Sequence, residues 1–330
     1  MARFGYTLMG EQSGPRELVR YAQAAEEAGF DFEVSSDHYS PWLVSQGHSP
    51  HAWTVLGAVA QATSHVELMT YVTCPTMRYH PAVVAQKAAT LQLLSEGRFI
   101  LGVGSGESLN EHVVGQGWPN VDTRQDMLVE AIEIIRELHT GDLITYVGEH
   151  FRVDSARIWD VPDTPVEIGI AVSGAEGVDA FAPLGDHLIA VEPKAELVDL
   201  WDEAHDADGS RPRSRKIGQV PISWDPDRDA AIERAHDQFR WFGGGWPVNA
   251  ELPTPASFAA ASRFVRPEDV AESIVCGPDL DDLAQSVRPF LDAGFTDIAL
   301  VQIGDEQQDR FLAEAAAPLL EKLRLLDAES

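Results

Sequence analysis

The clearest candidate for acid–base chemistry is the pair Asp37-His38, which ends a short apolar run and is followed by Trp42. A histidine titrates near neutrality, so its neutral imidazole can take the proton of a hydroxyl group at physiological pH. A neighbouring carboxylate can hold the imidazole or favour its protonated form. The ordinary alternative is a capping aspartate beside a surface histidine. The position at a strand end, with an aromatic residue nearby, favours a functional pair.

A glycine-rich segment, Gly102-Val103-Gly104-Ser105-Gly106-Glu107, ends another apolar run and is followed by Asn110. Its spacing invites comparison with a dinucleotide-binding fingerprint. However, further glycines and a proline between 115 and 119 interrupt the next helix, and the fingerprint belongs on the first strand of its unit. We interpret the glycines as small residues that let a flat ligand lie close to the backbone, with Glu107 and Asn110 facing it. A tight glycine turn beside a solvated glutamate is the alternative.

Two other strand ends carry polar or nucleophilic groups. Ser173-Gly174 stands directly before a helical stretch, where backbone N–H groups can bind a phosphate or the serine can simply cap the helix. The sequence pairs no base with Cys74, so a small wall residue is favoured over a nucleophile. The eleven histidines contain no H-x-x-x-H pair, and we predict no metal site.

These groups follow strands in a regular alternation of β-rich apolar runs and amphipathic helical stretches, which predicts a parallel sheet with helical crossovers. We expect strands at 4–9, 32–36, 66–73, 99–103, 166–172, 187–191, 216–222 and 296–301. A helix is expected to begin at Pro15, and others to cover 53–62, 81–94, 124–138 and 309–325.

Eight strands, most of them followed by a helical stretch, favour a (β/α)8 TIM barrel with insertions, an α/β fold, at a length of 330 residues. A doubly wound open sheet is the alternative, because periodicity alone cannot show that a sheet closes. We expect one domain over residues 1–330. In a TIM barrel the reactive residues lie where strands end and the following loops begin, which is where the candidates stand.

Two segments break the alternation. Residues 143–153 predict an inserted β-hairpin that turns at Val147-Gly148-Glu149. Residues 240–266 contain Trp241-Phe242-Gly243-Gly244-Gly245-Trp246-Pro247, which favours neither a long helix nor a central strand. We expect an irregular, lid-like segment there, and its tryptophans favour a pocket wall over a linker. Trp246 is assigned to the substrate pocket.

The charge balance excludes several classes of function. The chain has 24 Lys and Arg against 53 Asp and Glu, a formal net charge of −29. A surface this negative repels nucleic acids and anionic lipids. No apolar run approaches the ~20 residues that span a bilayer, no signal peptide is predicted, and two cysteines make no disulfide framework. We expect a soluble, cytoplasmic protein with a small-molecule substrate and with no nucleic-acid or membrane partner.

The basic residues are themselves unusual, because only four are lysines and twenty are arginines. An excess of carboxylates with few lysines is typical of proteins kept soluble in strong salt, where repulsion is screened over ~3 Å at about 1 M. A GC-rich genome that replaces lysine by arginine is the alternative explanation.

Several motifs together resemble a known family. They are Ser36-Asp37-His38 with Trp42, Cys74-Pro75-Thr76-Met77-Arg78-Tyr79 followed by Pro81, the segment ending at Glu107 with Asn110, and Gly185-Asp186. This set resembles the luciferase-like barrel oxidoreductases, and most closely the branch with the deazaflavin-dependent glucose-6-phosphate dehydrogenases. The resemblance covers nearly the whole chain, including Gln308-Asp309-Arg310 and the final helix.

The resemblance implies a cofactor and roles for several residues. The cofactor is coenzyme F420, a deazaflavin that carries two electrons, lying across the carboxyl-terminal mouth of the barrel. His38 would take the substrate hydroxyl proton while a hydride leaves the same carbon, and Glu107 would donate a proton to the ring. Trp42 would shape the pocket and steady the developing charge. Asp37 would hold His38, and Asn110 would contact the ring.

The resemblance also implies further cofactor contacts and a homodimer. Tyr71-Val72 falls where the family often has a non-proline cis peptide that forms a bulge under the ring. Ser173 and Gly174 match the loop that binds the cofactor phosphate. The residues assigned to the cofactor are therefore Asp37, Tyr71, Val72, Cys74, Glu107, Asn110, Ser173 and Gly174.

The phosphate site of the sugar-phosphate enzymes is incomplete in this chain. Lys194 matches one of its cations, and we assign it to the substrate pocket together with Trp42 and Trp246. Glu272 stands where an arginine is expected, and another expected lysine falls near 248–249. A dianion facing a carboxylate is disfavoured. We therefore predict a neutral alcohol or an unphosphorylated sugar rather than glucose 6-phosphate, although Arg263 or Arg266 could rebuild the site.

The sequence thus predicts an F420-dependent dehydrogenase of a hydroxyl-bearing carbon, or the same enzyme run backward as a carbonyl reductase. Three alternatives stay open: a sugar-phosphate dehydrogenase with a rebuilt phosphate site, an FMN-dependent monooxygenase of the same barrel family, and a non-catalytic barrel. Asp37-His38 with Trp42 and Glu107 favours the dehydrogenase, because a monooxygenase needs no such base.

Overall fold

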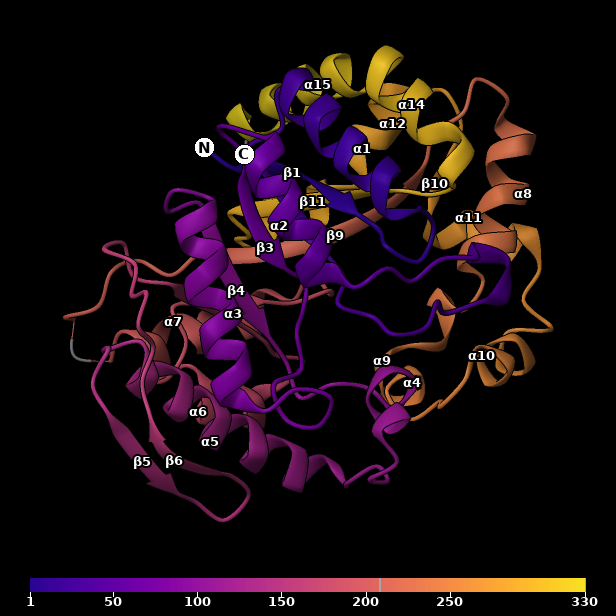
Figure 1. Ribbon diagram of the computed structural model, residues 1–330. Coiled ribbons are helices and arrows are strands. Elements are labelled where there is room, and N and C mark those ends of the chain that lie inside the picture. The colour runs from indigo at the N-terminus through magenta and orange to yellow at the C-terminus, as the bar shows by residue number, and fades with distance from the viewer. Residues whose placement is uncertain (208, 330) are drawn as a thin grey trace.

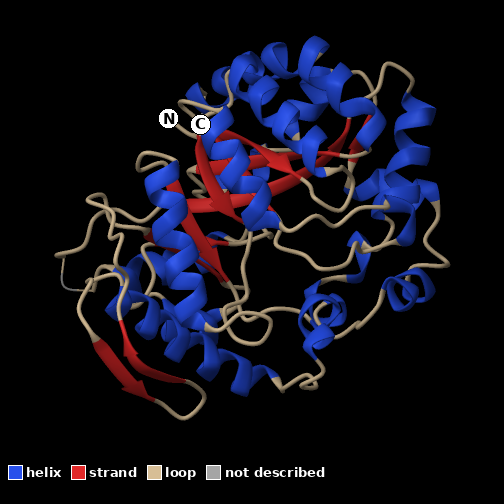
Figure 2. Ribbon diagram, in the orientation of Figure 1, coloured by secondary structure: helices blue, strands red, loops and turns tan. Residues whose placement is uncertain are grey.

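The computed structural model describes residues 1–207 and 209–329, and its parallel strands form a closed barrel (Figures 1 and 2). Eight of the described strands are neighbours in the order β9-β11-β1-β2-β3-β4-β7-β8, and the pairing of β8 with β9 closes the ring. The predicted TIM barrel is therefore confirmed. The strands are β1 (Arg3–Leu8), β2 (Phe32–Ser35), β3 (Glu67–Thr70), β4 (Phe99–Val103), β7 (Glu167–Ala171), β8 (His187–Ile189), β9 (Lys216–Ser223) and β11 (Asp297–Gln302).

Helices surround this barrel and pack on its outer face (Figure 2). Within the described residues, no helix is both long enough and apolar enough to cross a membrane. The helices are α1 (Pro15–Ala28), α2 (Ala52–Ala62), α3 (Pro81–Leu94), α4 (Ser108–Glu111), α5 (Val121–Leu138), α6 (Ala175–Phe181), α7 (Ala195–His205), α8 (Arg228–Phe239), α9 (Trp246–Asn249), α10 (Pro255–Ala261), α11 (Pro267–Ser273), α12 (Leu280–Gln285), α13 (Arg288–Asp292), α14 (Asp305–Glu314) and α15 (Ala316–Ala328), with short 3-10 helices at Val44–Gln46, His112–Val114 and Phe242–Gly244.

Helix α1 shows how the sequence determines where a helix begins and ends. Pro15 occupies its first turn, where a missing N–H costs nothing, and Leu18 and Ala22 recur at helical spacing on the buried face. Gly29 follows the helix in the left-handed conformation, and its N–H bonds back to the carbonyls of the last turn. The helix therefore begins and ends where its own residues require.

Most predicted elements match, and the exceptions have local causes. Helix α3 and strand β4 have the predicted bounds. The single helix expected at 309–325 is two helices, α14 and α15, separated at Ala315. Strand β3 ends at Thr70 instead of residue 73, before a cis peptide bond between Tyr71 and Val72. A two-residue strand, β10 (Val275–Cys276), was not predicted because so short a run has no periodicity.

Two insertions interrupt the barrel. Strands β5 (Ile144–Val147) and β6 (Arg152–Ala156) pair in antiparallel fashion outside it. Residues 240–266 were expected to be irregular, but they contain the 3-10 helix at Phe242–Gly244 and the helices α9 and α10. Prolines start α9 and α10, which explains why the segment folds as several short helices. In Figure 1, α4, α9 and α10 lie on the same side of the molecule.

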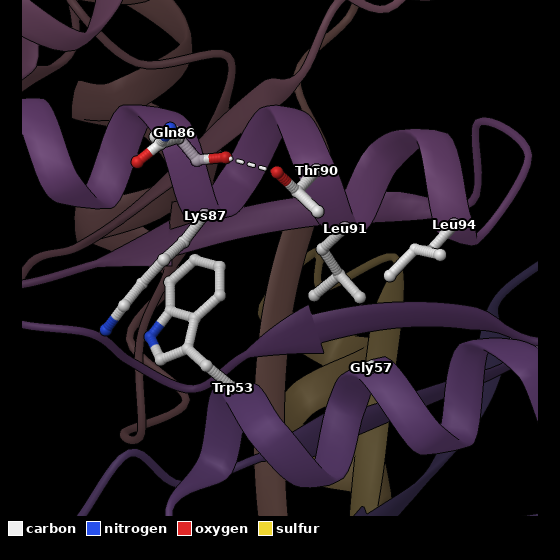
Figure 3. A pocket seen from close by; sticks show the side chains of 7 residues that line it. All are labelled: Trp53, Gly57, Gln86, Lys87, Thr90, Leu91 and Leu94. Carbon is white, nitrogen blue, oxygen red and sulfur yellow. Dashed lines mark hydrogen bonds between the residues drawn. The ribbon is translucent and has the colours of Figure 1, made fainter. Parts of the chain in front are cut away.

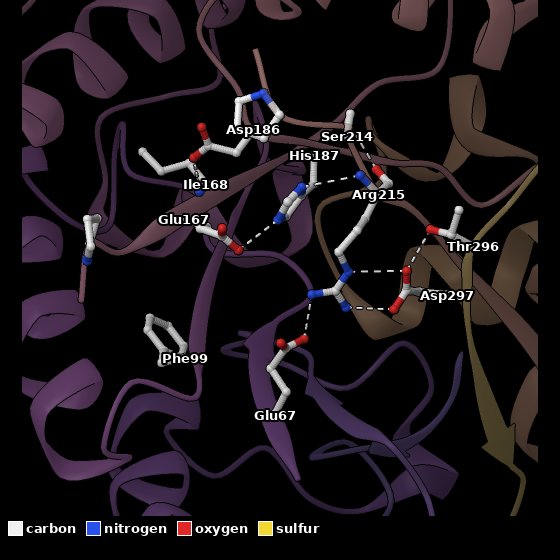
Figure 4. A network of polar contacts seen from close by, with 12 residues as sticks. Glu67, Phe99, Glu167, Ile168, Asp186, His187, Ser214, Arg215, Thr296 and Asp297 are labelled. Carbon is white, nitrogen blue, oxygen red and sulfur yellow. Dashed lines mark hydrogen bonds and ion pairs between the residues drawn. The ribbon is translucent and has the colours of Figure 1, made fainter. Parts of the chain in front are cut away.

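The barrel interior is apolar in the middle and ionic at the amino-terminal ends of the strands. The central side chains are Phe32, Val34, Met69, Ile100, Ile189, Ile217 and Ala299. Below them, the guanidinium of Arg215 contacts Glu67 at 2.7 Å and Asp297 at 2.6 Å (Figure 4). His187 and Glu167 form a second pair nearby, at 3.0 Å. This network closes one end of the barrel and leaves the carboxyl ends for the functional site.

Candidate active site

Three strand ends converge on His38. Glu11 comes from the loop after β1, His38 from the loop after β2 and Glu107 from the loop after β4. Nδ1 of His38 forms an ion pair with Oε1 of Glu11, and Nε2 lies 2.9 Å from Oε1 of Glu107. Both carboxylates are almost completely buried, and the His38 side chain is 14% exposed. The imidazole therefore stands between two carboxylates at the carboxyl end of the barrel.

The two carboxylates decide the protonation state of the imidazole. Burial alone lowers the pKa of His38, but Glu11 and Glu107 outweigh it and raise the pKa from 6.5 to about 10. Burial also disfavours the charged form of Glu11, yet His38 and the Ser36 hydroxyl, 2.7 Å away, lower its pKa overall. We predicted a histidine that is neutral at physiological pH. Free of ligand, His38 is instead an imidazolium, because Glu11 adds a charge that we had not placed there.

Asp37 does not hold His38, and that prediction is wrong. Its buried carboxylate accepts hydrogen bonds from Trp53 Nε1 at 3.0 Å, Thr73 Oγ1 at 2.8 Å and the Tyr79 hydroxyl at 3.2 Å. Arg78 completes the set with an ion pair at 3.2 Å. Asp37 thus ties α2 and the loop after β3 together behind the histidine. The sequence analysis missed Glu11, although a carboxylate just after the first strand meets the same strand-end criterion as Glu107.

Asn110 connects the loops that carry His38 and Glu107. Its amide Nδ2 donates to Glu107 Oε1 at 2.5 Å. Its Oδ1 accepts the backbone N–H groups of Tyr39 at 2.7 Å and Ser40 at 3.1 Å. The structure therefore places Asn110 beside Glu107 and the His38 loop, and the hydrogen bonds of its side chain are to Glu107, Tyr39 and Ser40. Its contact with a cofactor ring stays a prediction.

A second ionic layer supports this arrangement. Glu111 accepts the backbone N–H of Arg78 at 2.9 Å, and the Arg78 Nε lies 3.4 Å from its other oxygen. Burial raises the pKa of Glu111 to about 7, although Arg78 opposes this shift. The guanidinium of Arg78 therefore bridges Glu111 after β4 and Asp37 after β2. It fixes the spacing of the two loops that carry His38 and Glu107.

Trp42 lies beside the imidazole. The ring centroids of Trp42 and His38 are 5.0 Å apart and the planes cross at 76°. Trp42 is 7% exposed and belongs to a cluster with Met9, Leu43 and Leu109 at this end of the barrel. The predicted pair of an imidazole and an indole is present.

The glycines after β4 are needed for packing between two strand ends. The contact with a flat ligand that we predicted for them stays a prediction. A Cβ on Gly104 would lie 2.8 Å from a methyl group of Val72. One on Gly106, whose φ is +80°, would lie 2.6 Å from the Cys74 sulfur. These glycines let the ends of β3 and β4 approach each other. Burial raises the pKa of the Cys74 thiol, so it is neutral, as a wall residue should be.

Tyr71 and Val72 pack against the apolar side chains of the barrel interior, at the end of β3. The bond between them is cis, as the family resemblance implied. The Tyr71 hydroxyl is buried and has no hydrogen-bond partner among the described residues.

Ser173 and Gly174 are exposed and precede α6, where the Gly174 carbonyl accepts the N–H groups of Gly177 and Val178. Ser173-Gly174 after β7 and Tyr71-Val72 after β3 both follow the carboxyl ends of barrel strands, as expected for a site at the carboxyl-terminal mouth of the barrel.

The other two residues assigned to the substrate pocket are less closely tied to His38. Lys194 is 55% exposed and pairs with Glu192 at 2.5 Å. Trp246 begins α9 and is 40% exposed. No contact of either side chain with His38 occurs within residues 1–207 and 209–329. Their part in a substrate pocket stays a prediction.

A separate groove lies on the outer face of the helical layer, between α2 and α3 (Figure 3). Its lining residues are Trp53, Gly57, Gln86, Lys87, Thr90, Leu91 and Leu94. Trp53 lines this groove and also donates its N–H inward to Asp37. The groove itself contains none of the acid–base residues around His38.

Comparison with known proteins shows the family of this chain. The model of the luciferase-like monooxygenase family matches residues 1–297. The chain belongs to this luciferase-like family. The resemblance inferred from the motifs is thereby confirmed at the level of the family.

Two curated relatives of this chain are named F420-dependent glucose-6-phosphate dehydrogenase. The protein of Amycolatopsis mediterranei (strain U-32) is 35% identical and aligns with 99% of this chain and 100% of its own length. That of Nakamurella multipartita is 37% identical, covering 98% of this chain and 97% of its own. A solved structure, an F420-dependent secondary alcohol dehydrogenase in complex with an F420-acetone adduct, is 30% identical with a TM-score of 0.89. It covers 98% of this chain and 99% of that one.

Proposed function

We propose that this protein is a coenzyme F420-dependent oxidoreductase that transfers a hydride between a hydroxyl-bearing carbon and the deazaflavin. Relatives named for this cofactor match the chain over nearly its full length, which supports the cofactor assignment. The observation that carries the proposal is the placement of His38 between Glu11 and Glu107. Oxidation of an alcohol needs a group that moves a proton, and this cluster supplies one.

The residues at the mouth of the barrel fit a bound deazaflavin. The unpartnered Tyr71 hydroxyl is a buried polar atom that a ligand there could satisfy. Tyr71, Val72, Cys74 and Asn110 would hold the ring, and Ser173 with Gly174 would receive the phosphate of its side chain. Asp37 supports them from behind, through its bonds to Trp53 and Thr73. When bound, the deazaflavin supplies the two-electron acceptor or donor of the reaction.

The protein's part in the reaction is the handling of one proton. Both ring nitrogens of His38 face carboxylates, so a substrate hydroxyl reaches a nitrogen only by competing with one of them. The Nε2 of His38 and Oε1 of Glu107 are 2.9 Å apart, close enough for a proton to pass between them. Glu11 stays on Nδ1 and stabilises the imidazolium that forms when the hydroxyl loses its proton. As an imidazolium, His38 is the proton donor for the reverse reaction, reduction of a carbonyl.

The charges around the site favour a neutral substrate. One imidazolium with two carboxylates leaves a net negative charge where a substrate would bind. The cations that could rebuild a phosphate site are engaged elsewhere: Lys194 pairs with Glu192, Arg266 pairs with Asp269, and Arg263 lies over Phe264. We therefore propose a neutral alcohol or unphosphorylated sugar, and not glucose 6-phosphate, as the efficient substrate.

A cofactor titration followed by a substrate screen tests this proposal. Oxidised F420 and FMN are each added to the purified protein, and binding is followed by the change in cofactor absorbance or fluorescence. The protein with F420 is then given secondary alcohols, sugars and glucose 6-phosphate at low and at high salt. We expect tight binding of F420, weak binding of FMN and turnover of neutral alcohols. Binding of FMN alone, with oxygen consumption, would favour the monooxygenase, and faster turnover of glucose 6-phosphate would contradict the substrate class.

We also propose that the enzyme acts as a homodimer in the cytoplasm. Helix α3 exposes three large apolar side chains, Val83, Leu93 and Leu94, at 45%, 45% and 40% of their surface. These side chains would be covered if α3 lay in the subunit contact. Light scattering at several protein concentrations measures the oligomeric state, and a mass of one chain throughout would contradict the dimer.

A further inference from the structure

Trp42 is fixed by aromatic side chains from the 240–266 segment. The ring of Trp241 stacks on it, with centroids 4.1 Å apart and planes 14° from parallel. Phe258 of α10 meets Trp42 edge-on at 5.0 Å and 77°, and Phe258 is completely buried. The indole beside His38 is therefore covered on one face and braced on one edge by residues distant in sequence.

The backbone carbonyl of Gln238 holds the ring of Trp241 directly and the backbone of Trp42 through the side chain of Gln46. Gln46 accepts the Trp42 N–H at 2.8 Å through its side-chain oxygen. The side-chain amide of Gln46 donates to the backbone oxygen of Gln238, near the end of α8, at 3.2 Å. The Trp241 Nε1 donates to the same Gln238 oxygen at 3.1 Å. The two stacked indoles are thus both connected to the last turn of α8.

We propose that Trp241 is a positioning residue that fixes Trp42 against His38, and thereby limits the size of the group that a substrate can place beside its reacting carbon. This inference rests on the proposed function. A bulky substituent could enter only by displacing the Trp42 indole, and displacement breaks the stack with Trp241. Aromatic pairs contribute about 0.5–1.5 kcal/mol beyond the burial of their area, so the stack resists such a displacement. Small secondary alcohols need no displacement.

The test compares Trp241→Ala and Trp241→Phe with the wild type, and uses Trp159→Ala as a matched control. Trp159 is 80% exposed and its ring lies over Arg157, so the control removes an indole from the surface. Three properties are measured: the paired circular-dichroism bands of excitonically coupled indoles, the dissociation constant of F420, and the ratio of kcat/KM for 2-propanol to that for 1-phenylethanol. Trp241→Phe keeps a stacked ring even if Trp241→Ala folds poorly.

We expect both Trp241 variants to lose the paired bands, and Trp159→Ala to keep them. The kcat/KM ratio should fall about tenfold in Trp241→Ala, the order of magnitude that hydrophobic pockets discriminate. It should stay within about twofold in Trp241→Phe, and the F420 dissociation constant should not change. A merely structural role would lower kcat/KM for both alcohols in the same proportion.

Three results would overturn the inference in different ways. Wild-type turnover of alcohols with an unchanged ratio in Trp241→Ala would remove the selectivity role and leave the proposed function intact. Intact paired bands with no alcohol turnover in the wild-type protein would contradict the proposed function, and with it the selectivity role. Paired bands that persist in Trp241→Ala would show that the stack of Trp42 on Trp241 does not form.

Discussion

At the scale of single residues, the site depends on which carboxylate touches the imidazole. Glu107 contacts Nε2 of His38, and two other acidic residues close to the imidazole in sequence or in space, Glu11 and Asp37, do different things. Glu11 forms an ion pair with Nδ1, whereas Asp37 turns away and binds Trp53, Thr73 and Tyr79. Adjacent residues of a chain point in different directions, so sequence proximity was the wrong guide. The two acids can be separated by experiment.

Replacing Glu11 by Gln removes a charge that keeps His38 protonated. Alcohol oxidation needs the neutral imidazole, so kcat/KM should rise with pH through the His38 pKa of about 10. In Glu11→Gln this rise should shift to lower pH by at least about one unit, equivalent to roughly 1.4 kcal/mol. The measurement is the pH profile of kcat/KM for F420 reduction.

Asp37→Asn is the control for this profile. In Asp37→Asn the pH at which kcat/KM rises should be unchanged, because Asp37 makes no contact with the imidazole in the described structure. The substitution should instead lower the free energy of unfolding by about 3 kcal/mol, since Arg78 loses a buried partner. A shift of the profile in Asp37→Asn but not in Glu11→Gln would contradict the assignment of the two acids.

At the scale of elements, the ionic network below the barrel joins strands that are distant in the chain. Arg215, just before β9, binds Glu67 at the start of β3 and Asp297 at the start of β11 (Figure 4). Its side chain is 19% exposed and that of Asp297 is 1% exposed. Arg215→Met removes the nearer partner of both carboxylates and leaves them Arg3, at 3.3 Å from Glu67 and 3.5 Å from Asp297. We expect a loss of about 3 kcal/mol in the free energy of unfolding, measured by denaturant titration.

The same substitution should not affect cofactor binding. The network lies at the amino-terminal ends of the strands, whereas His38 and Glu107 follow the carboxyl ends. The F420 dissociation constant of folded Arg215→Met should therefore match that of the wild type. A variant as stable as the wild type would show that the network contributes little to closing the barrel.

Strand β2 contains a buried carboxyl group, that of Glu33, with no hydrogen-bond partner among the described residues. Neither side-chain oxygen of Glu33 has a hydrogen bond in the described part of the chain, and burial raises its pKa well above 4.5. The native state therefore holds a proton that the unfolded chain releases above pH 4.5, so this group makes the protein less stable as pH rises. Glu33→Met should stabilise the protein at neutral pH by at least about 1.4 kcal/mol.

Thermal unfolding from acidic to neutral pH measures this effect. The advantage of Glu33→Met should grow as pH increases from about 4.5, where the unfolded-state carboxyl titrates. An advantage that shrinks over the same range would mean that Glu33 is ionised and paired in the native protein.

The sequence predicted the elements better than their contacts. The barrel and the placement of His38, Trp42 and Glu107 at its mouth follow from strand ends and motifs, because parallel strands bring their carboxyl ends together. The contact of Glu11 with His38 depends on loop conformation, which periodicity does not encode. The stack of Trp42 on Trp241 joins segments almost two hundred residues apart, and composition indicated only that the second segment was aromatic.

At the scale of the whole molecule, the net charge of −29 should govern stability. Repulsion among surface carboxylates opposes folding, and molar salt screens it over ~3 Å. We predict that the midpoint of thermal unfolding rises steadily from about 0.1 M to about 2 M KCl. Protein that is fully stable and active in dilute buffer, with no gain from added salt, would contradict adaptation to strong salt.

The central claim is that His38 moves the proton that accompanies hydride transfer. The most direct test compares the wild type with His38→Ala, following the loss of oxidised F420 absorbance with a neutral secondary alcohol and measuring F420 binding by fluorescence. The account predicts a rate at least about 10³-fold lower in His38→Ala, in the range that positioned acid–base groups contribute, with the F420 dissociation constant unchanged within a few fold. Turnover of His38→Ala at the wild-type rate, with F420 bound equally well, would contradict it.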